Sequence, residues 1–534
     1  MATDSAEASR SASHEYATRF ILIAVTLVGI AHIALLPPWE GFDEYAHWSS
    51  IQQIADTHTL PYYGRAYISA DVDAYAGPMP YGTIVPFDKT GRETYREFKE
   101  RGGRSVELSA ISSYRSGTVL NWEAQHPPLF YLLMTPVYEM TRGFGWVHHL
   151  FALRLAAWTL AVAGLAIGVF ATTRIVGKEE PAVGPIMAGF PFLIPQFFPE
   201  MARLGNDSLC LLFMGIAWAL TVNLLRRGAQ LGQSLTLGMV LGLGLLTKAF
   251  FVPISVGIGA LLAACWWRDR SSRRARDLLT VAAIASLIGG WWYVRNYILY
   301  GSFVGANDFL QANAGFNFWE GMRYNFSVAE FLRGLGMLAG TFSLAGTWSL
   351  ARAPEVLIAV PLALPAVTVG TWLSRLKHKG PLDWAPAIIV GLLLLGLLAH
   401  LLHGLAMTGR VATPAWYLHI AAAPIAFAMA LGWRTPRLNA VLSAASVGAM
   451  VIAWGLQLSL FSGCSTKSDA QKYYSFEGSD CIFDSITLDA LTIPILGAIA
   501  MALAVLFLLT GLRSLYGDAI GVAPLRTIQR SLPS

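Results

Sequence analysis

The sequence is poor in charged residues. Only 13% of its 534 residues are Asp, Glu, Lys or Arg, whereas 55% are hydrophobic, a balance that excludes an ordinary soluble globular protein. Short strands of alternating polarity are also lacking, which argues against a membrane β-barrel. The formal net charge is +5, but the basic residues stand in small groups at the ends of apolar segments. That placement orients helices in a bilayer, so we expect no nucleic-acid partner.

Cysteine is scarce as well, with four residues in the chain. Cys210 and Cys265 stand inside apolar segments and are expected to be packing residues. Cys464 and Cys481 share one polar segment. If that segment faces an oxidising compartment, the two predict a disulfide; two free thiols are the alternative.

The abundant feature is a series of apolar runs of roughly 17 to 25 residues, the length that an α-helix needs to cross a bilayer. We therefore predict an all-α polytopic membrane protein that forms a single domain over residues 1–534. About twelve transmembrane helices are expected. One of them ends at Arg226 and Arg227, and the others lie at 20–36, 149–174, 182–199, 232–247, 250–267, 277–294, 355–373, 384–403, 414–432, 438–460 and 488–511.

The basic groups predict how these helices are oriented, because Lys and Arg collect in the cytoplasm. Both termini are then cytoplasmic in a bacterial inner (plasma) membrane, and residues 37–148, 299–353 and 461–486 form outer loops. No small-residue cleavage site follows the first apolar run, so we expect an uncleaved helix. Segment 126–140 is short and proline-rich and predicts an amphipathic or re-entrant helix, and 299–353 predicts helices lying on the outer surface.

Polar side chains gather at the predicted outer ends of the helices. The first are Asp43, Glu44 and His47, directly after the first helix. Carboxylates at a bilayer edge are retained where they are paired or functional. Six further candidates follow later outer turns: Glu200, Arg203, Asp207, Lys248, Arg295 and Arg410. A carboxylate can take a proton from an attacking hydroxyl while cations hold a departing phosphate, the two roles that an inverting glycosyl transfer requires.

The motifs in order are DE after the first helix, HPPLFYLL, RLGNDSL, GLGLLTK and WWYVRNYILYG. Their order resembles the GT-C superfamily of membrane glycosyltransferases, which includes aminoarabinose transferases and protein O-mannosyltransferases, and in particular bacterial members with a DExxH first-loop motif. The resemblance implies a polyprenyl-phosphate-linked sugar donor and a catalytic base at Asp43, with Glu44 as the other candidate. It also implies that Asp207 orients the acceptor or a metal. Lys248, Arg295 and Arg410 would bind the donor phosphate.

Simpler interpretations stay open for each candidate. Asp43 and Glu44 could cap a surface helix, Asp207 could be an N-cap, and the basic residues could only settle helix ends at the interface. His47 could steer Asp43, bind a metal or only pack; a divalent ion is permitted but not required. A transporter or flippase, or a ligase, of lipid-linked saccharides is the alternative function. The acceptor could be a glycan, a lipid or a protein. The chain shows no WWD-type signature and no soluble C-terminal domain, so we do not expect protein N-glycosylation.

Overall fold

The computed structural model describes most of the chain. The described residues are 2–75, 77–78, 93–102, 111–228, 230–304, 317–348, 350, 353–376, 380–411, 413–467, 474–486 and 492–520. Parts of the three predicted outer loops therefore lie outside the described residues.

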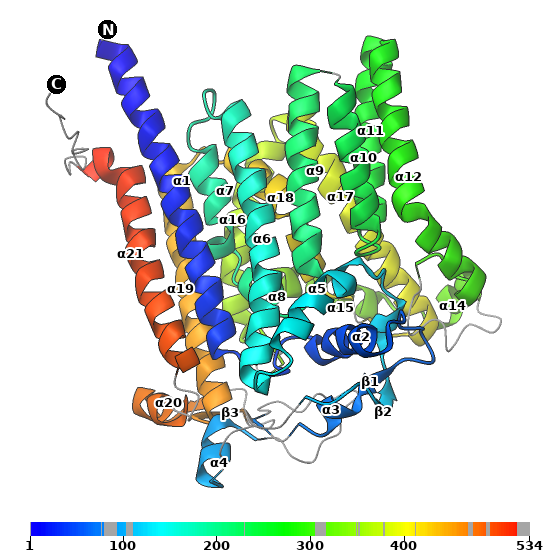
Figure 1. The fold of residues 1–534 in the computed structure, drawn as a ribbon. Coiled ribbons are helices and arrows are strands. Elements are labelled where there is room, and N and C mark those ends of the chain that lie inside the picture. The colour runs from blue at the N-terminus through cyan, green and yellow to red at the C-terminus, as the bar shows by residue number, and fades with distance from the viewer. Residues whose placement is uncertain are drawn as a thin grey trace, which may run out of the picture.

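Long apolar helices dominate this part of the chain (Figure 1). Nine of them are long and apolar enough to cross a membrane: Ala12–Leu35 within α1 (Ala2–Leu35), α6 (Trp146–Val176), α9 (Asp207–Arg227), α11 (Phe251–Asp269), α12 (Ser272–Tyr300), α16 (Glu355–Leu373), α17 (Pro381–Thr408), α19 (Pro436–Ser462) and Ile493–Ser514 within α21 (Thr492–Ile520). Their backbone groups are satisfied inside each helix, which the hydrocarbon core demands.

Three shorter apolar helices complete the pattern among the described residues. They are α7 (Val183–Leu193), α10 (Leu231–Leu245) and the segment Trp416–Leu431, which combines η4 (Trp416–Ala421) and α18 (Ala422–Leu431). Each predicted span overlaps one of these twelve segments. The prediction of an all-α polytopic membrane protein is confirmed.

The two ends of the bundle hold different parts of the chain. The N-terminus and the end of α21 lie at one end, and the elements of the connecting loops lie at the other (Figure 1). At this loop end the chain forms α2 (Glu44–Thr57), α3 (Ala70–Asp73), α4 (Tyr95–Glu100), η2 (Trp122–Gln125), α20 (Ser479–Ile486) and two small antiparallel sheets, β1 (Tyr67–Ser69) with β2 (Ser116–Leu120) and β3 (Ser465–Lys467) with β4 (Tyr474–Phe476).

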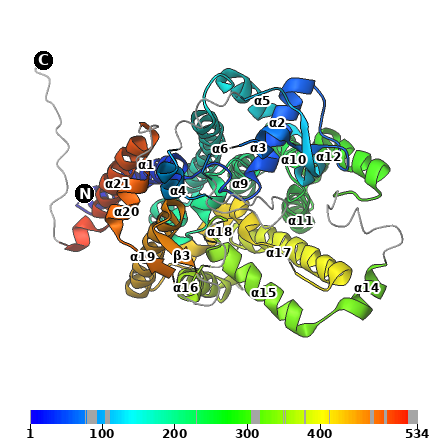
Figure 2. The same cartoon turned by 90° about the horizontal axis from the view of Figure 1, so that it is seen from below.

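The segments predicted to lie on the surface form short helices. The proline-rich segment becomes α5 (Leu129–Thr141), which packs against α2 and α6. The second outer region contains α14 (Phe318–Asn325) and α15 (Val328–Ser343). None of the three is long enough to count as a candidate span. Seen from the loop end, α14 and α15 run along the margin of the bundle beside α17 (Figure 2).

Close helix packing depends on small residues where α6 meets α9. A Cβ added to Gly215 would lie 2.0 Å from the carbonyl oxygen of Gly164, so neither position accepts a side chain without the helices separating. Trp158 of α6 also donates a 3.0 Å hydrogen bond to the carbonyl oxygen of Thr26 in α1. These contacts join α1, α6 and α9, whose loop ends carry the polar residues described next.

A disulfide joins Cys464 and Cys481, with their Cα atoms 5.9 Å apart. It connects the end of α19 to α20 at the loop end of the bundle. Cys210 and Cys265 are free and buried.

Candidate active site

Asp43 occupies an unusual backbone position at the start of α2. Its φ is 60° and its ψ is 9°, the left-handed region that few non-glycine residues adopt. As the N-cap residue it makes no side-chain capping hydrogen bond, so the capping interpretation does not account for its carboxylate. The side chain is only partly buried, whereas Glu44 beside it is 0% exposed.

The residues on both sides of Asp43 are held firmly. The carbonyl oxygen of Phe42 accepts a 2.8 Å hydrogen bond from Arg203, and the Phe42 ring stacks on Trp416 with centroids 4.6 Å apart. Glu44 accepts two hydrogen bonds from Arg154 of α6, at 2.8 and 2.6 Å. Strained backbone persists where its surroundings determine it, and these contacts set the position of Asp43.

Glu44 itself belongs to a buried structural ion pair. Besides the bonds to Arg154, its carboxylate accepts the backbone N–H of Leu204 at 2.9 Å. Arg154 also donates to the carbonyl oxygens of Leu36 and Pro37, at 2.6 and 2.8 Å. The pair therefore ties the end of α1, the start of α2, α6 and the loop before α9 into one unit.

A second ion-pair network lies between α8 (Phe197–Met201) and α9. Arg203 binds Glu200 at 2.6 Å and Asp207 at 3.0 Å. Lys248, in the turn between α10 and α11, donates to both oxygens of Asp207 at 2.8 Å. All four side chains are buried, with at most 4% exposure. Asp207 is thus paired on two sides rather than serving as the N-cap, which is Asn206.

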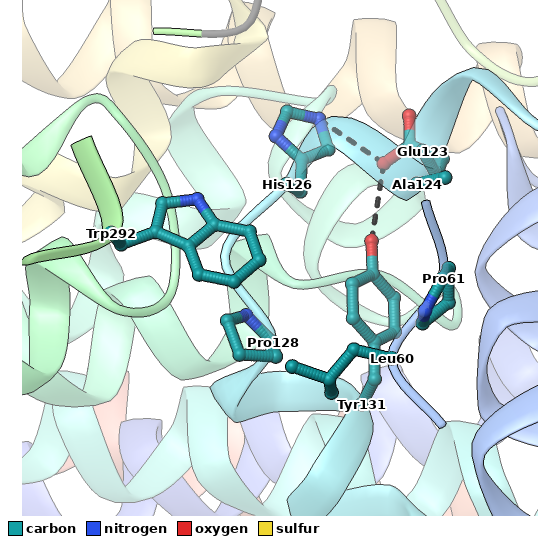
Figure 3. A pocket seen from close by; sticks show the side chains of 8 residues that line it. All are labelled: Leu60, Pro61, Glu123, Ala124, His126, Pro128, Tyr131 and Trp292. Atoms are coloured by element: carbon teal, nitrogen blue, oxygen red, sulfur yellow. Dashed lines mark hydrogen bonds and ion pairs between the residues drawn. The ribbon is translucent and has the colours of Figure 1, made fainter. Parts of the chain in front are cut away.

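Glu123, a residue outside the sequence prediction, forms a third cluster (Figure 3). Its Oε2 accepts a hydrogen bond from the Tyr131 hydroxyl at 3.3 Å and lies 3.2 Å from Nε2 of His126 and 3.4 Å from Nδ1 of His47. His47 therefore contacts Tyr131 and Glu123. Glu123 has no arginine or lysine partner in the described part of the chain.

A small cavity adjoins this cluster. It has a volume of about 10 Å³, room for about one water molecule, and Glu123, His126 and Tyr131 line it together with Trp292 of α12. In Figure 3 His126 and Tyr131 both point at the Glu123 carboxylate, while the Trp292 indole lies on the far side of His126. This space is too small for a sugar ring.

Burial sets the protonation of these groups. It raises the pKa of Asp43 from 3.8 to about 6, with a further rise from the Glu123 charge and an opposing effect of Arg203 and Lys248. Burial likewise raises the pKa of Glu123 from 4.5 to about 7, again against Lys248 and Arg203. Burial lowers the pKa of His126 to about 3, and Lys248 adds to that fall. His126 is therefore neutral at pH 7, and Asp43 is close to the range of an effective general base.

Two predicted cations stand apart from the networks. Arg295, at the loop end of α12, is half-buried, and its guanidinium lies 4.4 Å from the Trp292 ring centroid, next to the Glu123 cavity. Arg410 is exposed, and among the described residues its guanidinium makes no hydrogen bond or ion pair. Arg295 lies at the same end of the bundle as Asp43, as the sequence required.

A metal site is not apparent in this arrangement. Among the residues that the structure describes, no group of three or more His, Cys, Asp or Glu side chains could hold a metal ion. The divalent ion that the sequence permitted therefore has no evident ligand set here.

Glu123 could have been found from the sequence by one signal. It lies three residues before His126, the first residue of the HPP motif. An acidic residue at that spacing from a histidine can form a local pair. Nothing in the sequence placed His47 beside this pair, because 76 positions separate His47 from Glu123 along the chain.

Comparison with known proteins finds similarity in structure alone, since no family model and no curated protein matches the sequence. ArnT from Cupriavidus metallidurans, bound to undecaprenyl phosphate, aligns with 94% of this chain and 78% of its own, at 14% identity and a TM-score of 0.45. The archaeal oligosaccharyltransferase AglB from Archaeoglobus fulgidus, in complex with an inhibitory peptide and a dolichol-phosphate, aligns over 95% of this chain at 14% identity and a TM-score of 0.34. The chain spans 56% of that AglB chain. Both proteins are membrane glycosyltransferases of the GT-C superfamily, the group that the sequence motifs resemble.

Proposed function

We propose that this protein is an inverting glycosyltransferase that uses Asp43 as its general base. It would move a sugar from a polyprenyl-phosphate donor to a hydroxyl of a glycan, lipid or protein acceptor. One observation carries the proposal: Asp43 is partly exposed and free of ion pairs among the described residues, whereas Glu44, Glu200 and Asp207 are buried and bound to cations.

The proposed reaction is a single displacement. The acceptor oxygen attacks the anomeric carbon on the face opposite the phosphate and transfers its proton to the Asp43 carboxylate. The bond between that carbon and the phosphate oxygen breaks, and polyprenyl phosphate leaves with the electron pair. The configuration at the anomeric carbon is inverted by this attack from the opposite face. A pKa raised to about 6 lets Asp43 remain largely ionised at pH 7 and still accept a proton.

The cations divide into two groups in this mechanism. Lys248 and Arg203 are engaged by Asp207 and Glu200, so their role is to hold the loop before α9 against Phe42 and Asp43. Arg295 and Arg410 have guanidinium groups outside these networks, and we assign the donor phosphate to them. This assignment departs from the role that the motif resemblance implied for Lys248.

We further propose that the loop end faces the periplasm of a bacterial inner membrane and that both termini are cytoplasmic. Arg174, Lys178 and Arg226 lie at the end of the bundle that holds the termini, as the positive-inside rule requires for a cytoplasmic face (Figure 1). Gathering of the acids at the opposite end favours an enzyme over the transporter alternative, which needs charged groups at mid-membrane on several helices.

Substitution of Asp43 by Asn tests the proposal. Detergent-purified protein would be incubated with a panel of undecaprenyl-phosphate monosaccharides and an extract containing acceptors, and the release of undecaprenyl phosphate would be measured. We expect the release rate to fall by roughly 10²- to 10⁴-fold, the usual contribution of a general base.

Asp480→Asn is the matched control, since Asp480 is an exposed aspartate at the same end of the bundle. It should leave the rate unchanged. Full activity in the Asp43→Asn protein would remove Asp43 from the mechanism, and absence of release by the unaltered protein with every donor would contradict the donor class.

A further inference from the structure

A second cavity lies at the opposite end of the bundle from Asp43. It has a volume of about 410 Å³ and opens between the first turns of the α1 span and the last turns of α6. The side chains and backbone that line it belong to His14, Glu15, Arg19, Phe170, Thr173, Arg174, Gly177, Lys178 and Pro181. No residue of the Asp43 region takes part in it.

The cavity carries an excess of positive charge. Arg19 is neutralised by Glu15, at 2.5 Å. Arg174 and Lys178, in contrast, make no hydrogen bond or ion pair within the described part of the chain. Two unmatched positive charges therefore remain among the side chains that line the cavity.

The two acidic residues that follow Lys178 in the chain bind cations on other parts of the bundle. Glu179 binds Arg226 of α9 at 2.7 Å, and Glu180 binds Arg434, which lies just before α19. The two glutamates thus face other helices. They leave Arg174 and Lys178 without a carboxylate, although both glutamates directly follow Lys178 in the chain.

The spacing of the lining residues suits a lipid. Phe170, Arg174 and Lys178 are four residues apart and so share one side of α6 and of the turn that follows it. Phe170 lies deeper in the span and the two cations nearer its end. An acyl chain could therefore run along Phe170 while a phosphate reached Arg174 and Lys178.

We propose that this cavity binds the phosphate headgroup of an anionic membrane lipid. Basic pockets between transmembrane helices are suited to such headgroups, and the volume is within the range of small-molecule sites. The site lies in the leaflet at the end of the bundle that holds the termini, and it is independent of the glycosyl transfer proposed above. Bound lipid would join α1 to α6 through the charges that the protein leaves unmatched.

Native mass spectrometry of the purified protein in a neutral detergent tests this site. Phosphatidylglycerol is titrated and the fraction carrying one lipid is measured. The variant Arg174→Gln/Lys178→Gln should bind on the order of tenfold more weakly, because each cation near a headgroup contributes to the attraction. The charge-preserving variant Arg174→Lys/Lys178→Arg should bind within about twofold of the unaltered protein.

The matched control is Arg227→Gln/Arg273→Gln, which removes two exposed cations at the same end of the bundle but outside the cavity. Its affinity should change less than about twofold. If the cavity and control variants weakened phosphatidylglycerol binding equally, binding would depend only on the net charge of the protein, and the proposed site would be wrong. A parallel arm adds inorganic phosphate: displacement of the lipid at matching concentrations would make free phosphate the ligand and the lipid assignment wrong. Phosphatidylcholine should give no saturable one-lipid adduct.

Discussion

The loop end of the bundle contains two kinds of carboxylate side chain: those bound to an arginine or lysine, and those without such a partner. Glu44, Glu200 and Asp207 each bind an arginine or lysine directly and are at most 1% exposed. Asp43 and Glu123 bind no arginine or lysine among the described residues, and their pKa values rise to about 6 and about 7. The adjacent pair Asp43 and Glu44 shows this difference most directly.

The difference separates carboxylates that hold other groups in place from those that can exchange a proton. A carboxylate bound to a buried arginine or lysine is fixed in place by that contact, even where burial raises its pKa, as it does for Glu200 to about 7. One that is desolvated without such a cation is easily protonated, which is what a general base needs. The paired acids therefore build the frame, and we propose the unpaired Asp43 as the reactive group.

The largest expected effect on stability comes from breaking the frame at Glu44. Glu44→Gln leaves Arg154 buried without its counter-charge, and loss of one partner of a buried pair costs about 3–5 kcal/mol. Unfolding in detergent micelles should show that loss. The double variant Glu44→Leu/Arg154→Leu, which removes both charges, should lose less. A Glu44→Gln protein of normal stability but without activity would instead make Glu44 the base.

The second comparison concerns Lys248. Lys248→Met removes one of the two cations that bind Asp207, and we expect a loss of about 1–3 kcal/mol in unfolding free energy. Lys248→Met/Asp207→Leu should regain part of it. Binding of undecaprenyl phosphate should change little. If stability were normal while that affinity fell about tenfold, Lys248 would be a phosphate ligand, as the motif resemblance implied.

The unpaired acids should make stability depend on pH. Both have folded-state pKa values above the usual ones of 3.8 and 4.5, so their protonated forms favour the folded state. That contribution is complete below about pH 4 and is lost as pH rises to about 7, at about 1.4 kcal/mol for each pKa unit. Activity should change in the opposite direction, falling as pH drops below about 6.

Thermal unfolding at a series of pH values measures this slope. Asp43→Asn and Glu123→Gln should each flatten it between about pH 4 and pH 7, whereas Asp480→Asn should not. An unchanged slope in both variants would contradict the raised pKa values.

The smallest effect is expected at Tyr131. Tyr131→Phe removes the hydroxyl that donates to Glu123 and contacts His47. One hydrogen bond contributes about 0.5–1.5 kcal/mol, so we expect a rate about 2- to 10-fold lower. Loss of this donor also raises the pKa of Glu123 further, and the acid limb of the pH–rate profile should shift upward if Glu123 acts with Asp43. An identical profile would limit Glu123 to packing.

Much of the fold could be read from the sequence because each transmembrane helix is determined locally. A run of apolar residues must satisfy its own backbone in lipid, so its length predicts a span without knowledge of its neighbours. The short segment at 126–140 is too short for a span by the same reasoning, and it forms the 13-residue helix α5. The gathering of Asp43, Asp207 and Arg295 at one end of the bundle follows from the order of the spans.

The chemistry of each acid was decided only by tertiary structure. Asp43 and Glu44 are adjacent and similar in sequence, yet the partner of Glu44 lies 110 residues away on α6. The role of Lys248 depended on an aspartate 41 residues away, and that of Glu123 on a histidine from another helix. Charge pairing depends on distance in space, so the apolar pattern could predict where the helices run, while the packed bundle alone decided which carboxylates are bound to an arginine or lysine.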